Sequence, residues 1–316
     1  MSNADAVRTI ARPAREVPVV VETDVLVCGG GPGGTAAAVA AARQGARVTL
    51  IERYNHLGGL ATGGLVLVLP HFVDHDRQVI GGIGLETRDC LVERGHAGYR
   101  KRDGDSSAFD PEALKWLSVK QCMDAGVEVL HHCWLSDAVV QDGRVAGALF
   151  ESKSGPAAAL AKVVVDATGD GDIFAWAGAE FEHSNQGIGV PFRLAGIDVP
   201  RWKADRAERQ QWHVEFWKRL RESIGWPSVF YIEHLPPQPD LAWGNNMHSV
   251  ADGLDFRALS HIETDARLKI HEAVEILRAE LPGFDGVWLV DTVSQIGVRR
   301  TRRLKGTFRL TAEETH

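Results

Sequence analysis

Cysteine is scarce in this 316-residue sequence, which has four scattered thiols and no C-x-x-C pair. Disulfide frameworks and zinc sites need clustered cysteines, so neither is predicted, and reduced, mostly buried thiols are expected. No apolar run approaches the roughly 20 residues that a transmembrane helix requires. Residues 1–20 carry arginines but lack the apolar core of a secretory signal. These absences predict a cytoplasmic protein with no membrane partner.

Basic residues are not in excess either: the formal net charge is −7 and the isoelectric point is near 6.0. An acidic protein has no general attraction to nucleic acid. One basic run, Arg299 to Lys305, has no nucleic-acid reader motif beside it, so no nucleic-acid partner is predicted. His71, Asp74, His75 and Asp76 have a tolerable spacing for a metal, but a polar loop explains them equally well, and no metal site is predicted.

The most informative segment present is residues 24–52, DVLVCGGGPGGTAAAVAAARQGARVTLIE. An apolar strand leads into Gly29, Gly31 and Gly34, a G-x-G-x-x-G spacing, and a helix of small residues follows. Gly29 permits the tight turn, Gly31 leaves room for a pyrophosphate, and Gly34 lets the helix pack closely on the sheet. The positive end of the helix favours a phosphate, and Pro32 near its first turn costs little. The segment therefore predicts a dinucleotide-binding βαβ unit.

Glu52 ends the second strand of this unit, where a carboxylate can accept hydrogen bonds from the adenosine ribose. A glycine turn with a purely structural role is the alternative, although the strand, helix and acid together favour a nucleotide. The motif does not by itself distinguish FAD from NAD. A second glycine-dense stretch, residues 57–64, is explained by close approach of the backbone to a ligand.

Further elements can be predicted along the chain. Asp110 is a helix N-cap with Pro111 at the first position, and that helix ends at Gly126. Strands at 138–140 and 145–150 flank Asp142-Gly143, a hairpin signal, and the strand 161–165 then returns to the main sheet. We therefore expect an α/β fold: a Rossmann-like parallel sheet with a three-stranded antiparallel insertion.

The second half of the chain differs in character. A strand at 192–197, helical patterns at 202–225 and 260–281, and a strand at 286–293 predict an inserted α+β substrate or cap domain. Five tryptophans between positions 202 and 243 fit its packing core better than a sugar-binding surface. The expected division is residues 1–187 for the first part of the cofactor domain, 188–290 for the cap, and 291–316 returning toward the cofactor domain.

Four stretches, DVLVCGGGPGGTAAAVAAARQGARVTLIER, HLGGLATGG, FDPEALK and VVVDATGDGDIFAWAGAEFE, together resemble the FAD-dependent oxidoreductases of the glutathione-reductase-like superfamily. Within that superfamily the chain is similar to a large bacterial FAD-dependent oxidoreductase family, with a more distant relation to fumarate reductase and L-aspartate oxidase flavoproteins. The stretch PGFDGVWLVDTVSQIGVRRTRRLKGTFRLT is similar to that family's segment before its second flavin-contacting region. The resemblance implies FAD as cofactor.

Carried onto this sequence, the resemblance also implies cofactor contacts at four turns. The residues are Gly29, Gly31, Pro32, Gly33 and Gly34 for the pyrophosphate; Glu52 and Arg53 for the adenosine ribose; Gly58, Gly59 and Thr62 for the path toward the flavin; and Ala167, Thr168, Gly169 and Asp170 for the dinucleotide. The family continues past residue 316 with a segment that returns to the flavin. The sequence therefore leaves open whether the chain is a fragment or a natural truncation, or whether a second copy in a homo-oligomer or a partner chain completes the flavin site.

Three residues are candidates for catalysis. Arg299 and Arg302 can clamp a substrate carboxylate, because guanidinium is always charged and binds in a bidentate manner; a solvated basic edge is the alternative. The family favours an acid where Arg300 stands, so ion pairing in this run is expected to differ. His248, next to two asparagines, is the candidate acid–base, although a solvated loop histidine explains it too.

The sequence as a whole predicts an FAD-dependent oxidoreductase that transfers hydride between a small organic substrate and the flavin N5. One alternative is an NAD(P)-linked dehydrogenase with the same βαβ unit. Another is a non-catalytic, flavoprotein-like subunit that needs a partner chain. A two-nucleotide reductase is disfavoured because no second G-x-G-x-x-G follows a strand.

Overall fold

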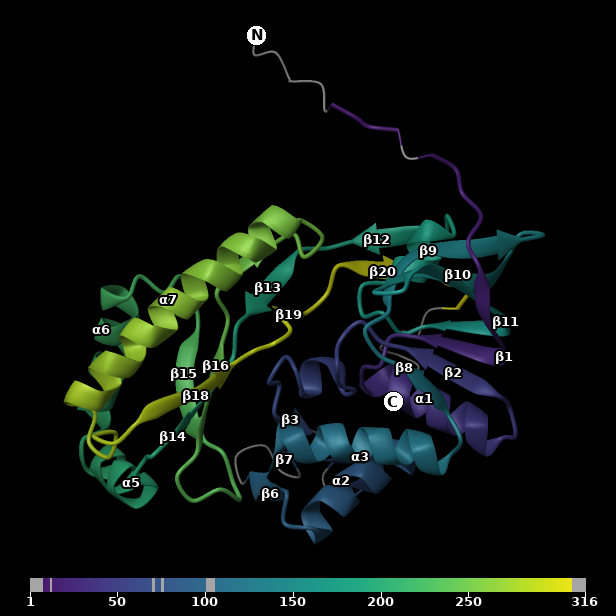
Figure 1. Ribbon diagram of the computed structural model, residues 1–316. Coiled ribbons are helices and arrows are strands. Elements are labelled where there is room, and N and C mark those ends of the chain that lie inside the picture. The colour runs from purple at the N-terminus through teal and green to yellow at the C-terminus, as the bar shows by residue number, and fades with distance from the viewer. Residues whose placement is uncertain (1–7, 12, 70–71, 75–76, 101–105, 309–316) are drawn as a thin grey trace.

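A six-stranded sheet organises the first half of the chain (Figure 1). The computed structural model describes residues 8–11, 13–69, 72–74, 77–100 and 106–308. The strand order is β8-β2-β1-β11-β10-β9, in which β8, β2, β1 and β11 are parallel and β10 and β9 are antiparallel. The strands are β1 (Val19–Cys28), β2 (Val48–Ile51), β8 (Glu128–Leu130), β9 (Trp134–Gln141), β10 (Arg144–Ser152) and β11 (Gly155–Asp166).

This sheet confirms the predicted α/β fold and the hairpin at Asp142-Gly143, and it refines the expected insertion. β11 is one continuous strand that serves two purposes. Its first part pairs with β10 from Gly155 to Leu160, as the third strand of the antiparallel unit. The same strand runs parallel to β1 as far as Asp166, beside Cys28. β1 is likewise longer than expected, because residues 19–21 and the strand of the βαβ unit form one element.

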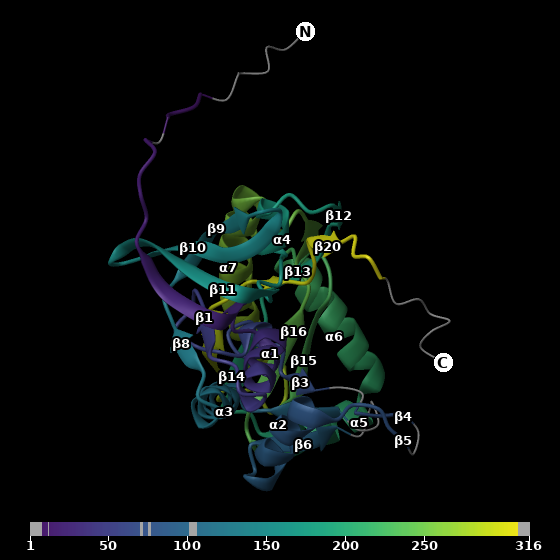
Figure 2. The same cartoon turned by 90° about the vertical axis from the view of Figure 1, so that its right-hand side faces the viewer.

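Helices cover one face of the sheet, as Figure 2 shows for α1 (Pro32–Arg43) and α3 (Pro111–Asp124). Val27 and Leu50 of the sheet and Val39 of α1 belong to one buried apolar cluster there. The predicted cap of α3 is confirmed, because the Asp110 carboxylate accepts a hydrogen bond from the Glu112 amide at 2.9 Å. α2 (Gly82–Glu93) packs against both helices, and the short α4 (Asp172–Trp176) contacts β9 and β11.

A four-stranded antiparallel sheet, β15-β16-β14-β18, organises the second half. Its strands are β14 (Phe192–Ala195), β15 (Phe230–His234), β16 (Ala242–Asn246) and β18 (Trp288–Thr292). The helices are α5 (Val199–Glu208), α6 (Gln210–Ser223) and α7 (Phe256–Glu280). The helix predicted over 202–225 is interrupted at Arg209, whose φ of −115° and ψ of 42° are not helical.

Short elements complete the described part of the chain. They are the 3₁₀ turn η1 (Gly59–Ala61) and strands β3 (Val68–Leu69), β4 (Val73–Asp74), β5 (Arg77–Gln78), β6 (Ala97–Arg100), β7 (Ser106–Phe109), β12 (Phe181–His183), β13 (Gln186–Gly189), β17 (Ser249–Ala251), β19 (Gly297–Val298) and β20 (Arg302–Leu304). The last strands carry the chain from the four-stranded sheet back toward the six-stranded one (Figure 1). Among the described residues, no helix has the length and apolarity to cross a membrane.

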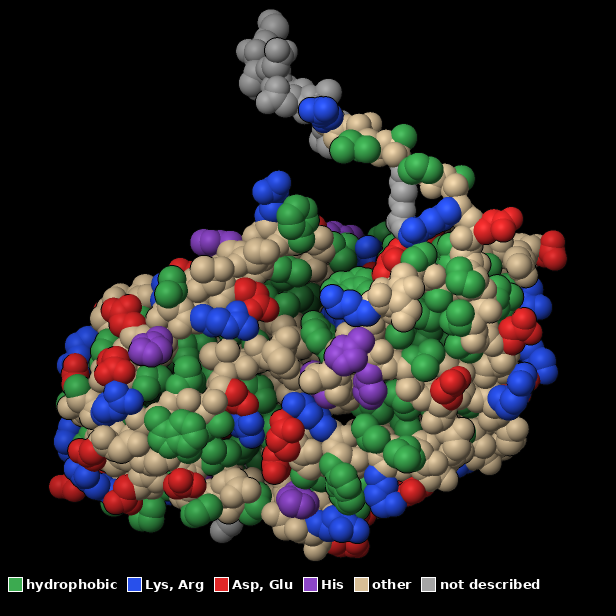
Figure 3. Space-filling view, viewed as in Figure 1, with side chains coloured by type: hydrophobic (Ala, Val, Ile, Leu, Met, Phe, Trp, Pro, Cys, Tyr) green, Lys and Arg blue, Asp and Glu red, His purple; other side chains and the backbone are tan. Residues whose placement is uncertain are grey.

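The largest apolar core joins residues from both halves, such as Phe109 and Leu117 with Phe192 and Ile262. The expected domain boundary at 187/188 therefore runs through one packed cluster, and the division stays a prediction. The predicted packing role of the tryptophans is confirmed, because three are buried in this core and two pack against it: Trp202, Trp226 and Trp243, with Trp212 and Trp217. Acidic and basic side chains are mixed over the face seen in Figure 3, with a hollow between the two halves.

Candidate functional site

A groove with a cavity volume of about 460 Å³ lies at the carboxyl ends of β1, β2 and β11. Ligands bind at this edge in open parallel sheets because the turns after the strands converge there. Eleven of its lining residues are ones that the sequence predicts to bind cofactor or substrate: Gly29, Gly31, Pro32, Gly33, Glu52, Arg53, Gly59, Ala167, Thr168, Gly169 and Arg302. The structure thus brings most of the predicted residues together.

The glycines of the first turn have two roles: some allow close packing of the backbone, and others leave open space. Gly29 has a φ of +107°, and a Cβ there would collide with the Ala167 carbonyl. A Cβ at Gly34 would collide with the Gly29 carbonyl, so the close packing of helix on sheet requires glycine. At Gly31 and Gly33, in contrast, no atom of the described chain outside the adjoining backbone lies within 4 Å of the position a Cβ would take. These two glycines leave a cradle open to the groove, whereas Gly34 lies behind it.

The amino end of α1 opens into this cradle, and no described side chain caps it or balances its positive charge. Gly31 is the N-cap, no side chain caps the helix, and its first turn contains no acid. Pro32 occupies one of the first helical positions, where a missing N–H is harmless. Free amides at the end of a 12-residue helix favour an anion such as a phosphate.

Glu52 is buried, and its carboxylate faces the same groove. One oxygen accepts a hydrogen bond from the Gly30 amide at 2.7 Å, and the other accepts one from the Tyr54 amide at 2.9 Å. A carboxylate has about four acceptor sites, so two remain for ribose hydroxyls. The Arg53 guanidinium lies 4.9 Å from the Tyr54 ring centre and 5.1 Å from that of Trp134, which places a cation between two aromatic rings at this end.

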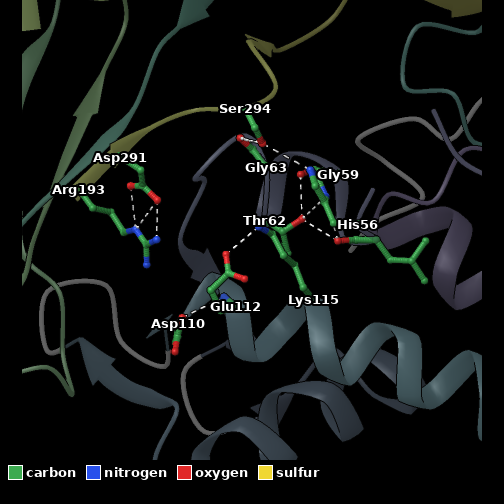
Figure 4. A network of polar contacts seen from close by, with 11 residues as sticks. His56, Gly59, Thr62, Gly63, Asp110, Glu112, Lys115, Arg193, Asp291 and Ser294 are labelled. Carbon is green, nitrogen blue, oxygen red and sulfur yellow. Dashed lines mark hydrogen bonds and ion pairs between the residues drawn. The ribbon is translucent and has the colours of Figure 1, made fainter. Parts of the chain in front are cut away.

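The second glycine turn contributes Gly59 to the groove, while Gly58 and Thr62 lie behind it. The buried Thr62 hydroxyl donates to the Leu57 carbonyl at 2.7 Å and lies 3.2 Å from the His56 Nδ1 atom (Figure 4). A Cβ at Gly58, where φ is +95°, would collide with the Thr62 side chain. Gly58 and Thr62 therefore shape the turn that presents Gly59.

The Ala-Thr-Gly turn after β11 is held by Asp166. This carboxylate accepts hydrogen bonds from the Thr168 amide at 3.1 Å, from the Thr168 hydroxyl at 2.7 Å and from the Phe174 amide at 3.0 Å. Asp170 lies outside the groove lining, where it accepts a hydrogen bond from the Thr301 hydroxyl at 2.8 Å. Burial raises the pKa of the Asp170 carboxyl.

The three predicted catalytic residues lie in different places. Arg302 lines the groove, but its guanidinium donates to Asp172 at 2.8 Å and to the Asp170 carbonyl at 3.0 Å. Arg299 is exposed and is not among the groove residues, so it is not brought beside Arg302. A bidentate clamp from both arginines therefore has no support in this geometry.

His248 is also outside the groove, and it is buried rather than solvated. Its Nε2 atom lies 2.6 Å from the Asp265 carboxylate, and its Nδ1 atom lies 3.2 Å from the Ser249 hydroxyl. Its ring also packs edge-on against Trp226. With both nitrogens engaged inside the protein, this histidine joins β17 to α7, and the geometry does not support the predicted acid–base role.

Sequence reasoning missed ten groove residues: Ile51, Leu60, Cys133, Trp134, Leu135, Asp166, Gly171, Asp172, Phe174 and Gln295. Residues 133–135 follow β8, and the carboxyl ends of parallel strands meet at one edge, so their place directly after an apolar strand was an available signal for them. Asp166 ends β11 and had the same signal. Gln295 had only a general signal, the expected return of residues 291–316 toward the cofactor domain, and no local motif that singled it out.

The parallel sheet, the glycine cradle and the buried acid define a fold of the dinucleotide-binding class. The sequence profile of the FAD dependent oxidoreductase family matches residues 24–316, and the chain belongs to that family. FAD, the predicted cofactor, is the cofactor that the family name specifies.

Curated relatives match part of the chain. Thiamine thiazole synthase of Aeropyrum pernix is 31% identical over 160 residues, which cover 47% of this chain and 55% of that protein. The chain thus spans about half the length of this relative. The geranylgeranyl bacteriochlorophyll reductase-like protein of Thermoplasma acidophilum is 18% identical with a TM-score of 0.53, covering 88% of this chain and 66% of that one. The myxobacterial chondrochloren halogenase CndH is 18% identical with a TM-score of 0.52, covering 90% and 64%. At these identities the two structures indicate a shared fold.

Proposed function

We propose that the groove binds FAD with its pyrophosphate in the cradle of Gly31 and Gly33. The observation that carries this proposal is the open space at both glycines, directly in front of the uncapped end of α1. Helix charge favours an anion at this point, and a side chain there would fill the space. Glu52 and Arg53 line the groove and would hold the adenosine half, while Gly59, close to Gly31, would face the other half.

The proposed activity is hydride transfer between a small organic substrate and the flavin N5. Bound FAD supplies the two-electron acceptor for such a step. The protein's part is to bind and orient the cofactor and to exclude water from the groove. Arg302 is held by Asp172, so we assign it the task of fixing the turn after β11 rather than of clamping a substrate. Arg299 and His248 stay predictions without a place in this scheme.

The proposal also includes the superfamily relation that the sequence predicts and the second copy or partner chain that it leaves open. The relation to the glutathione-reductase-like superfamily, with a distant one to fumarate reductase, is supported by the four motifs that carry the resemblance, three of which contribute residues to the groove. A second copy or a partner chain that completes the flavin site is consistent with the open groove. Size measurement of the purified protein with and without FAD tests that part.

The cofactor proposal is tested with Gly31→Val. Gly31 has φ −66° and ψ 179°, which a valine adopts without strain, so the fold should be unaffected while the cradle is filled. Gly81→Val is the matched control, because Gly81 is also an extended N-cap with no atom within 4 Å of a Cβ, but it precedes α2 outside the groove.

Absorbance in the blue flavin bands and titration of the apoprotein with FAD give the readout. We expect Gly31→Val to weaken FAD binding about tenfold or more, equivalent to about 1.4 kcal/mol, and Gly81→Val to leave it unchanged. Equal FAD affinity in both variants would contradict the proposed binding mode. A colourless protein that binds NAD instead would support the dehydrogenase alternative.

A further inference from the structure

The segment after β18 crosses from the four-stranded sheet to the groove and is fixed to the second glycine turn. The amides of Ser294 and Gln295 both donate to the Gly63 carbonyl, at 2.9 Å and 3.1 Å. Figure 1 shows this segment running from β18 to β19 between the two halves, and Figure 4 shows Ser294 directly beside Gly63. The backbone of Gln295 therefore has a fixed position relative to the groove.

The side chain of Gln295 lines the groove, and its amide oxygen is buried with no hydrogen-bond partner in the described structure. This is unusual, because buried polar atoms in folded proteins almost always have a partner. Three other polar side chains of the groove have hydrogen-bond partners in the protein. Glu52 holds two backbone amides, Asp166 holds the turn after β11, and Arg302 is paired with Asp172. Among the buried side-chain polar atoms of the described groove residues, the Gln295 Oε1 atom is the one without a partner.

The position of Gln295 along the groove identifies which half of a dinucleotide it meets. The adenosine end is marked by Glu52 and Trp134, which are tied together because the Cys133 amide donates to the Glu52 carbonyl at 3.1 Å. Gly31 lies in the middle, and a Cβ at Gly59 would come within 2.9 Å of its Cα. Gln295 is attached to the turn that carries Gly59, which the proposed binding mode assigns to the flavin half of the cofactor.

We propose that Gln295 is a cofactor-positioning residue whose side-chain amide binds the ribityl–flavin half of FAD. An unsatisfied carbonyl oxygen requires a donor, and the ribityl hydroxyls and the flavin ring N–H are the donors on that half. The inference rests on FAD binding in the groove. It assigns to the segment after β18 a direct part in holding the redox end of the cofactor. In the described structure the second glycine turn has no free polar side chain for this role, because Leu60 is apolar and the Thr62 hydroxyl donates to the Leu57 carbonyl.

The test compares two ligands on the purified apoprotein. Gln295→Met keeps the length of the side chain and removes its hydrogen bonds, whereas Gln295→Glu keeps an acceptor oxygen. FAD affinity is measured by flavin fluorescence, and ADP affinity by calorimetry, because ADP contains the adenosine and pyrophosphate but no ribityl or flavin group. We expect Gln295→Met to weaken FAD binding about tenfold, to leave ADP binding unchanged and to alter the absorbance band of bound flavin. Gln295→Glu should recover most of the FAD affinity.

Several outcomes would overturn the inference. Equal losses for FAD and ADP would mean that Gln295 acts on the adenosine half or on the groove as a whole. An unchanged FAD affinity would mean that its amide binds no part of the cofactor. A clear drop in the unfolding temperature of the Gln295→Met apoprotein would indicate a structural role. Failure of the wild-type protein to bind either ligand would instead refute the proposed function, so the two failures can be told apart.

Discussion

The two adjacent glycines at the start of α1 should respond to alanine in opposite ways. At Gly33, alanine meets no atom within 4 Å and gains helix propensity, which is worth up to about 1 kcal/mol in a helix interior and less in a first turn. At Gly34, the same methyl group would collide with the Gly29 carbonyl. That carbonyl cannot easily yield, because the Gly30 amide of the same peptide unit donates to the Glu52 carboxylate at 2.7 Å.

The expected magnitude follows from these two contributions. Overpacking a well-filled site costs about 1–3 kcal/mol, and a collision with fixed backbone belongs at the upper end of that range. After subtracting the gain in helix propensity, Gly34→Ala should lower the free energy of unfolding by about 2 kcal/mol, whereas Gly33→Ala should change it by less than about 0.5 kcal/mol.

Urea denaturation of the apoproteins, followed by circular dichroism, measures this difference at constant m-value. Titration with FAD then compares the cofactor affinities of the two variants. Gly33→Ala should weaken FAD binding because its methyl group occupies the cradle, although the fold is intact. The reasoning is refuted if Gly34→Ala proves as stable as Gly33→Ala, because the collision would then be relieved at no cost.

Three further changes test other parts of the structure. Trp134→Ala should weaken ADP and FAD binding by a similar severalfold factor, because its exposed ring stacks on Arg53 at the adenosine end, and calorimetry on both ligands would show whether the two losses differ. Asp170→Asn should flatten the pH dependence of stability. Burial raises the folded-state pKa of the Asp170 carboxyl above 3.8, so the folded state binds this proton more tightly than the unfolded state does. The stabilisation by the protonated carboxyl is therefore present at low pH and is lost as the pH rises through the raised pKa. Urea melts from about pH 4 to about pH 7 should show a smaller decline in the variant than in wild type. His248→Ala should reduce the free energy of unfolding by about 2 kcal/mol, because it leaves the Asp265 carboxylate without one partner, while FAD affinity stays at the wild-type value. A loss of FAD binding in that variant without a loss of stability would restore the acid–base hypothesis.

Local features of the chain were predictable because short-range chemistry determines them. The βαβ unit, the Asp110 cap and the Asp142-Gly143 hairpin each depend on a few neighbouring residues with defined backbone preferences. The two Cβ collisions at Gly29 and Gly34 give a physical reason for the glycine spacing that the sequence showed.

Other features depend on partners far away in the sequence. The sequence indicated that Arg302 was charged, but not that Asp172 would neutralise it, since 130 positions separate the two. Likewise, nothing around His248 indicated that Asp265 and Trp226 would enclose it. Gln295 reaches the groove only because the last strands return to the first sheet. Tertiary contacts of this kind have no local signature.

The shared carbonyl of Gly63 also has a consequence for how the protein is made. Its two amide donors lie about 230 positions later in the chain, since Gly63 and Ser294 are 231 residues apart. The glycine cradle can form as soon as the first βαβ unit has left the ribosome. The part of the groove that Gln295 lines can form only after nearly the whole described chain has been synthesised. Nascent chains should therefore acquire affinity for adenine nucleotides well before they acquire affinity for the complete flavin cofactor.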